Sequence, residues 1–127
     1  MPQESILYLG DTARLPYGTK SAQTVARYTA RNLAFLLTRD VKAIVVACNT
    51  ASALGLARLP APVPLWGVIE PGTEAAVAVT RGRVGVIATE STISSNAYET
   101  ALQKRMPELF VASQACGLFV PCLLYTS

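Results

Sequence analysis

Residues 42–50 have the sequence KAIVVACNT, the stretch that best indicates the fold of this chain. Its first six residues form a continuous, largely β-branched apolar run, as expected of a central parallel strand that is covered on both faces. Cys48, Asn49 and Thr50 follow this strand, and a helix is expected over residues 51–58. The stretch therefore predicts a strand–helix unit with three small polar side chains at the carboxyl end of the strand.

Strand-like and helix-like patterns alternate on both sides of this unit. Short apolar runs predict further strands at residues 5–10, 65–69, 83–88 and 109–112. Apolar spacing and capping residues predict helices at residues 22–37, capped by Ser21, at 73–79, and from Ser91 or Thr92 to residue 105. This alternation predicts an α/β protein built of βαβ units with a parallel sheet.

Two segments share a layout that suggests an internal repeat. Residues 45–50 (VVACNT) and 86–91 (VIATES) each join an apolar strand, an alanine and a polar cluster that opens a helix. A duplicated domain would produce this pattern, and so would two ordinary βα units. Because Pro71-Gly72 interrupts the strand–helix pattern, we place a domain boundary there, with a partial first domain at residues 1–72 and a partial second domain at 73–121.

Composition narrows the class of protein. Hydrophobic residues make up 51% of the 127 residues and charged residues 15%, which is typical of a folded domain with buried strands. No apolar run approaches the length of a membrane span, and the first residues do not resemble a secretory signal, so a cytoplasmic protein without membrane partners is expected. The net charge of +3 comes from scattered basic residues, which argues against a nucleic-acid partner.

Cysteine and histidine usage limits the available chemistry. The chain has three cysteines without a CxxC spacing, which predicts neither a disulfide framework nor a zinc site. It has no histidine, which excludes a Ser-His-Asp triad within these residues and disfavours a transition-metal site. Acid–base chemistry would therefore fall to Cys, Asp, Glu, Lys or Tyr side chains.

Cys48 is the most informative single residue. It lies at the carboxyl end of a predicted strand, where open α/β sheets bind ligands, and before a predicted helix, whose dipole favours a thiolate. Asn49 and Thr50 add polar groups that can hold a carboxylate. The alternative is a small buried hydrophobic residue followed by an ordinary helix cap, and position alone leaves both interpretations open.

Two further polar clusters follow predicted strands. Tyr17 and Gly18 lie in a loop in which glycine allows the backbone to approach a ligand closely, although these residues alone favour a generic turn. Thr89 and Thr92 follow the strand at residues 83–88, and helix capping is a sufficient explanation for them. Together the three clusters suit a small anionic ligand, but they do not indicate a reaction.

Longer motifs resemble the glutamate racemase family. Residues 8–21 (YLGDTARLPYGTKS) resemble its signature loop, and residues 47–52 (ACNTAS) resemble its first catalytic-cysteine motif. The resemblance extends from residue 5 to residue 121 and includes residues 67–72, 85–99 and 115–121. The ACNTA motif alone is shared with aspartate racemases, whereas its combination with GDTARLPYGTKS is specific to glutamate racemases.

The resemblance implies an enzyme that interconverts L- and D-glutamate for peptidoglycan synthesis without pyridoxal phosphate, metal or any other cofactor. Glutamate would bind between two pseudo-symmetric α/β domains of the aspartate/glutamate racemase fold, and two cysteines would act as bases on opposite faces of its α-carbon. Cys48 matches the first catalytic cysteine. The matching substrate-binding positions are Tyr17, Gly18, Asn49, Thr50 and Thr92, with Thr89 as a weaker candidate. Cys116 matches a structural position.

The chain also departs from the family pattern. The family's first strand with its Asp-Ser-Gly loop, and its second catalytic cysteine in a Gly-Cys-Thr-His-Tyr segment, have no match here. Residues 122–127 depart as well and are expected to be a non-native tail, so Cys122 is not taken as the second base. We therefore expect a fragment of a racemase, inactive alone, whose full-length form is a candidate homodimer. The alternatives are an aspartate racemase, which the residues Pro16-Tyr17-Gly18 disfavour, and a non-catalytic binding module.

Overall fold

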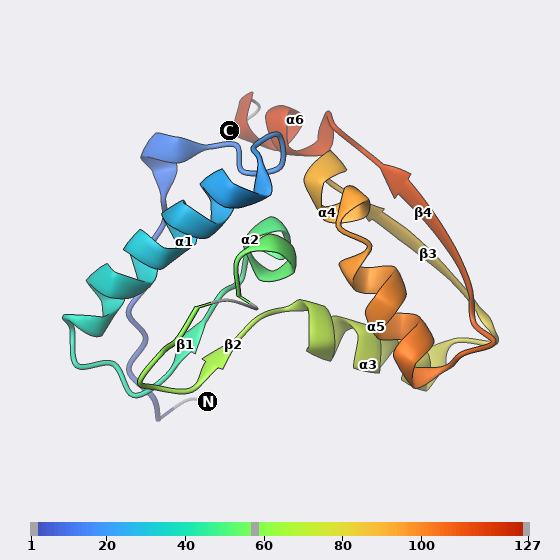
Figure 1. Cartoon of the computed structure of the whole chain (residues 1–127), viewed down its shortest axis with the longest axis horizontal. Helices are drawn as coiled ribbons and strands as arrows, with labels where there is room; N and C mark the ends of the chain where they lie inside the picture. The colour runs from blue at the N-terminus through green and yellow to red at the C-terminus, as the bar shows by residue number, and fades with distance from the viewer. Residues whose placement is uncertain (1–2, 57–58, 126–127) are drawn as a thin grey trace.

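The computed structural model describes residues 3–56 and 59–125 and has two parts, each built on a two-stranded parallel sheet (Figure 1). In the first part β1 (Ile44–Val45) pairs with β2 (Leu65–Trp66). In the second part β3 (Arg83–Ala88) pairs with β4 (Phe110–Ala115). A helical segment lies between the paired strands in each case, which confirms the predicted α/β fold with parallel βαβ units.

The first part is organised by α1 (Ala22–Leu37), which begins and ends where the sequence predicts. Ser21 caps it, since its side-chain oxygen accepts a hydrogen bond from the Thr24 N–H at 3.3 Å. The buried residues of α1 are Val25, Thr29 and Leu33, which are spaced four residues apart and so lie on one face of the helix. Helix α1 packs on α2 (Asn49–Leu54). A short 3-10 helix, η1 (Thr12–Arg14), precedes α1.

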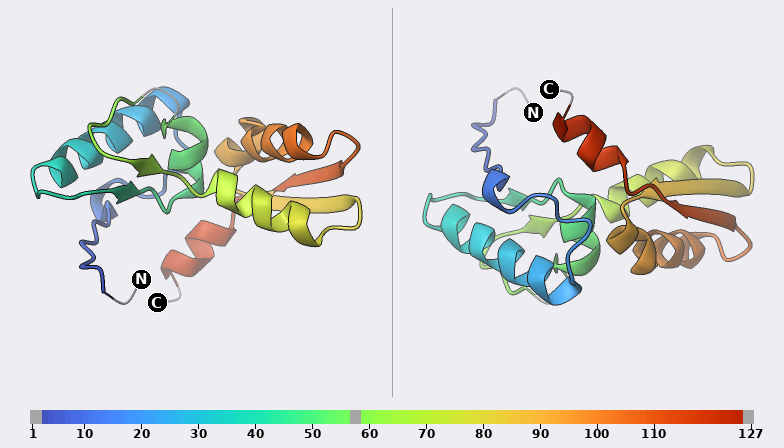
Figure 2. Two further views of the ribbon diagram at one scale, coloured as in Figure 1. Left: turned by 90° about the horizontal axis from the view of Figure 1, so that it is seen from below. Right: turned by 90° about the horizontal axis from the view of Figure 1, so that it is seen from above.

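The second part has its core on one face of the β3–β4 sheet. Val86, Leu102 and Leu109 are buried together, and residues of α3 (Ile69–Val79) and α5 (Ala97–Arg105) pack around them. Two shorter helices, α4 (Glu90–Ser94) and α6 (Phe119–Tyr125), lie beyond the carboxyl ends of the strands (Figures 1 and 2). The other face of the sheet is open, because Ile87 is 64% exposed.

The prediction of a strand at residues 5–10 is wrong. This segment pairs with no strand among the described residues, and its apolar side chains Ile6, Leu7 and Tyr8 are exposed. The expectation of a central strand at residues 42–47 also needs correction. Within the described chain β1 has β2 as its one neighbouring strand, and Val45 is 60% exposed. The apolar run therefore indicated the strand correctly, but the strand is not covered on both faces as expected.

The expected break at Pro71-Gly72 is also absent from the backbone. Helix α3 begins at Ile69 and continues through both residues, so the strand predicted for 65–69 ends at Trp66. Proline is tolerated here because the first-turn N–H groups of a helix have no partner within the helix. The division into domains at residues 72 and 73 stays a prediction, and α3 is the element that connects the two sheets (Figure 1).

The helix expected from Ser91 or Thr92 to residue 105 is divided in two. Asn96 has a left-handed backbone with φ of 54°, a conformation that asparagine tolerates better than most residues, and it separates α4 from α5. The first of these helices begins at Glu90, after Thr89. Strand β4 extends to Ala115, and α6 was not expected. The part of the expected helix 51–58 at residues 57 and 58, and residues 126 and 127 of the expected tail, lie outside the described residues.

No helix in the described part of the chain has the length and apolar character needed to cross a membrane. The longest, α1, has 16 residues.

Leu102 is the anchor of the second core, with 1% of its surface exposed. Truncating it in Leu102→Ala should lower the free energy of unfolding by about 2–5 kcal/mol, because the change removes buried methyl groups and leaves a cavity. Leu118 is 74% exposed and provides a matched control, for which the same truncation should change stability by less than about 0.5 kcal/mol. Urea unfolding followed by circular dichroism measures both, and equal effects would contradict this core.

Candidate active site

The polar turns after β1 and β3 meet between the two sheets, where α2 and α4 face each other (Figure 1). The hydroxyl oxygens of Thr50, Thr89 and Thr92 form a cluster with mutual distances of 3.0, 3.0 and 3.1 Å. Thr50 and Thr92 are buried. We call these three residues the threonine cluster, and they bring together the two segments whose sequences suggested a repeat.

Cys48 lies at the beginning of α2 with its side chain exposed. Its backbone is extended, with φ of −91° and ψ of 121°, and its sulfur accepts a hydrogen bond from the Ala51 N–H at 3.5 Å. The sulfur is therefore open to solvent at the carboxyl end of β1. This exposure argues against the interpretation of Cys48 as a buried hydrophobic residue and leaves the thiol accessible to a ligand.

Asn49, the next residue, contacts the second part of the fold. Its side-chain oxygen accepts a hydrogen bond of 2.5 Å from the hydroxyl group of Tyr98, which lies on α5. Tyr98 is not among the site residues predicted from the sequence, because a contact between residues 49 positions apart leaves no local pattern. Tyr98 is thus an additional side chain of the site.

Gly18 joins the same region from the loop before α1. It is buried, and its carbonyl oxygen accepts hydrogen bonds from the Ser91 hydroxyl at 2.7 Å and the Ser91 N–H at 3.2 Å. A Cβ atom on Gly18 would lie only 2.5 Å from Thr89 Cβ, so this close approach requires glycine. The loop is therefore attached directly to the turn that follows β3.

The Thr89 side chain does not cap a helix, contrary to the expectation from the sequence. It occupies the cap position of α4 but makes no side-chain capping bond. Its hydroxyl group instead bonds with the threonine cluster. This use of the side chain is not what a simple cap requires.

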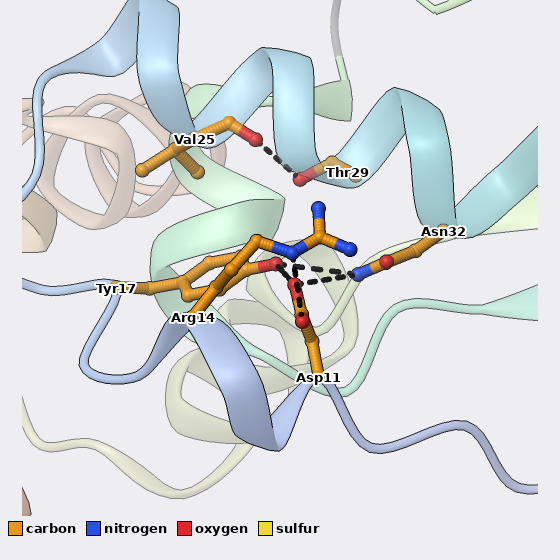
Figure 3. Close-up of polar contacts among 6 residues, drawn as sticks. All are labelled: Asp11, Arg14, Tyr17, Val25, Thr29 and Asn32. Atoms are coloured by element: carbon orange, nitrogen blue, oxygen red, sulfur yellow. Dashed lines mark hydrogen bonds and ion pairs between the residues drawn. The ribbon is translucent and has the colours of Figure 1, made fainter.

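Tyr17 has its hydroxyl group directed toward Asp11 and toward Asn32 of α1 (Figure 3). The hydroxyl donates to Asp11, and the Asn32 amide donates to both of them, at 3.3 Å to Asp11 and 3.2 Å to Tyr17. Asp11 also forms an ion pair with Arg14 at 3.0 Å. The phenol of Tyr17 is thus occupied within its own loop, and its backbone is the part nearest to Gly18.

A cavity of about 420 Å³ opens beside Asn49, and its lining does not include Tyr17, Gly18, Cys48 or Thr50. Its polar wall includes Asn49, Thr89, Thr92 and Tyr98, and the rest is largely apolar surface from α3, β3 and α6. A small ligand with one charged end and an aliphatic part suits such a wall. Cys116 lies farther along, after β4, where its N–H bonds to the Ala88 carbonyl at 2.8 Å.

Comparison with known proteins identifies this arrangement. Residues 1–122 match the family described as Asp/Glu/Hydantoin racemase. The chain belongs to this racemase family. The ACNT turn, the loop at Tyr17-Gly18 and the threonine cluster therefore lie in a racemase fold.

Individual relatives of this racemase-family chain are glutamate racemases. The one from Geobacter metallireducens is 56% identical over 124 residues, which are 95% of this chain and 46% of that protein. The structure of the RacE1 isoform from Bacillus anthracis superposes with a TM-score of 0.92 at 46% identity, over 94% of this chain and 46% of that one. The glutamate racemase from Francisella tularensis, solved in complex with D-glutamate, superposes with a TM-score of 0.90 at 41% identity. The match covers 98% of this chain and 48% of that one. The chain spans about half the length of these relatives.

The close approach of Gly18 to Thr89 makes a specific prediction for this racemase fold. Gly18→Ala should lower the free energy of unfolding by about 1–3 kcal/mol, because the added methyl group would overlap Thr89 and force the loop to move. A Cβ atom added at Gly85 in β3 would have no other atom within 4 Å. Gly85→Ala should therefore be neutral or slightly stabilising. Urea unfolding of both variants tests the contact, and a neutral Gly18→Ala would contradict it.

The phenol of Tyr17 should ionise at a higher pH than an ordinary tyrosine. Burial first, and then the hydrogen bond to Asp11, raise the pKa of Tyr17 from 10.0 to about 12. Since the folded-state pKa is the higher one, this group stabilises the fold fully below pH 10, and the contribution is lost as the pH rises toward 12. Ultraviolet titration should show a late-ionising tyrosine that is missing in Tyr17→Phe. A Tyr17→Phe titration identical to wild type would refute the assignment.

Proposed function

We propose that this chain is the part of a glutamate racemase that provides one of its two catalytic cysteines, Cys48. The observation that supports this most directly is the exposed Cys48 at the carboxyl end of β1, immediately before Asn49, which lines the cavity, and Thr50, which belongs to the threonine cluster. Relatives named glutamate racemase match 95% of the chain. In the proposed reaction, one cysteine removes the α-proton of glutamate and a second delivers a proton to the opposite face.

The residue types suit this chemistry. The α-proton of an amino acid is a weak acid, so the base must be held close to it and be poorly solvated. A thiolate is a base whose strength a protein adjusts readily. Asn49, Thr50 and Thr92 would donate hydrogen bonds to the substrate carboxylate and stabilise the negative charge that develops at the α-carbon. The loop would contribute at Tyr17 and Gly18 through its backbone.

The second base is proposed to lie outside these 127 residues. Cys116 follows β4, and Cys122 lies within α6, so both are on the second part of the fold beyond the carboxyl end of its sheet. We expect neither to replace the second catalytic cysteine, and we expect the chain alone to invert no glutamate. The complete enzyme is proposed to act without a cofactor in the cytoplasm, as a candidate homodimer, and to supply D-glutamate for peptidoglycan.

A chimeric enzyme tests this proposal. This chain would replace the 124 aligned residues of the G. metallireducens relative. In deuterated water, the chimera should convert L-glutamate to D-glutamate that contains deuterium at the α-carbon. Cys48→Ser should lower kcat/KM by roughly 10²–10⁴-fold, because it removes a positioned proton-transfer group.

Cys116→Ser is the matched control and should leave racemisation unchanged, while the 127-residue chain alone should show no inversion. Aspartate, tested in parallel, should not be racemised. A folded chimera that inverts aspartate instead would favour the aspartate racemase interpretation. Binding of glutamate without any inversion would favour a binding module. Normal turnover in Cys48→Ser would remove this residue from the mechanism.

A further inference from the structure

Tyr98 and Asn49 join the two parts of the fold through one hydrogen bond. The Tyr98 hydroxyl donates to Asn49 Oδ1 at 2.5 Å, and both residues line the cavity. We propose that Tyr98 is a positioning residue, which orients the Asn49 amide so that its NH2 group faces a ligand carboxylate in the cavity. This inference rests on the proposed function, in which Asn49 contacts glutamate.

The orientation of the Asn49 amide decides whether it attracts or repels an anion. An asparagine side chain has an acceptor oxygen on one side of its carbonyl carbon and a donor NH2 group on the other. Because Tyr98 occupies the oxygen, the NH2 group is directed to the opposite side. Among the described residues, no hydrogen bond uses this NH2 group. The reversed amide would present its oxygen to the carboxylate instead.

The phenol of Tyr98 is suited to act as the donor. Its bond to Asn49 is the one hydrogen bond of this hydroxyl within the described chain, and reversing the Asn49 amide would place an NH2 donor opposite the phenolic proton, which would then be left to solvent. A phenol is protonated at neutral pH, and burial raises the pKa of Tyr98 further. Chemistry at both ends of the bond therefore favours the same amide orientation.

Helix α3 packs against α5, which carries Tyr98. The backbone of α3 passes close to the Tyr98 ring, because a Cβ atom added at Gly72 would lie 3.6 Å from the ring and from its hydroxyl oxygen. The ring also packs at the margin of the core formed by Val86, Leu102 and Leu109. Tyr98 is thus supported by α3 and the core of the second part, while its hydroxyl reaches the first residue of α2. A rigid support is what a positioning residue requires.

Nuclear magnetic resonance of the ¹⁵N-labelled 127-residue chain tests this role. The Asn49 side-chain NH2 signal is assigned by its loss in Asn49→Asp. In the wild type this NH2 group should be ordered and should shift when D-glutamate is added. In Tyr98→Phe, which keeps the ring but removes the donor, the NH2 group should become mobile, and the Kd for D-glutamate should rise about two- to tenfold.

Tyr125→Phe is the matched control, since Tyr125 is 90% exposed, and it should change neither the NH2 signal nor the affinity. An Asn49 NH2 group that stays ordered in Tyr98→Phe would overturn the inference, even if glutamate binds more weakly. A wild-type NH2 signal that does not respond to bound D-glutamate would overturn it as well. A wild-type chain that binds no D-glutamate, but whose NH2 group becomes mobile in Tyr98→Phe, would support Tyr98 as the residue that orients Asn49, and the chimera alone would then decide the proposed function.

Discussion

The threonine cluster is the contact on which the relative placement of the two sheets depends. Thr50 and Thr92 are buried, and a buried hydroxyl group left without a partner costs about 1–3 kcal/mol. In this fold Thr50 finds its cluster partners in the other part of the chain. The two turns are therefore held together by directional hydrogen bonds, which specify distance and orientation more narrowly than apolar packing does.

This contact explains why the polar residues converge. Each parallel sheet directs the carboxyl ends of its strands toward the middle of the molecule, so the residues after β1 and β3 arrive at the same place (Figure 1). The loop that contains Gly18 reaches the same place, because Ser91 binds its carbonyl group and Thr89 packs against it. A site made in this way combines groups from three separate segments while each segment keeps its own local structure.

The sequence predicted what depends on local pattern. The limits of α1 and β3 follow from apolar spacing and from the Ser21 cap, and the structure reproduces both. The parallel pairing and the position of the polar clusters follow from the alternation of strands and helices. The family resemblance contributed more than pattern did, because it grouped distant motifs into one site before any geometry was known.

Long-range contacts account for what the sequence did not predict. The Thr89 side chain looks like a helix cap in the sequence, but its hydroxyl bonds with Thr92 nearby and with Thr50, which is distant in sequence. Tyr98 has no local feature that separates it from other helix residues. The break at Asn96 and the continuous helix through Pro71 and Gly72 were not predicted either, since asparagine tolerates helical and left-handed backbones and proline is tolerated in the first turn of a helix.

Tyr17 shows how a side chain can determine the position of a neighbouring residue's backbone. Its hydroxyl group, Asp11, Arg14 and Asn32 form a polar network beneath the loop (Figure 3). This network anchors the loop to α1 one residue before Gly18, whose backbone must pass within contact distance of Thr89. The phenol thus fixes the loop from one side and Ser91 fixes it from the other. The tyrosine at this position is thus explained by the placement that the backbone of Gly18 requires beside Thr89.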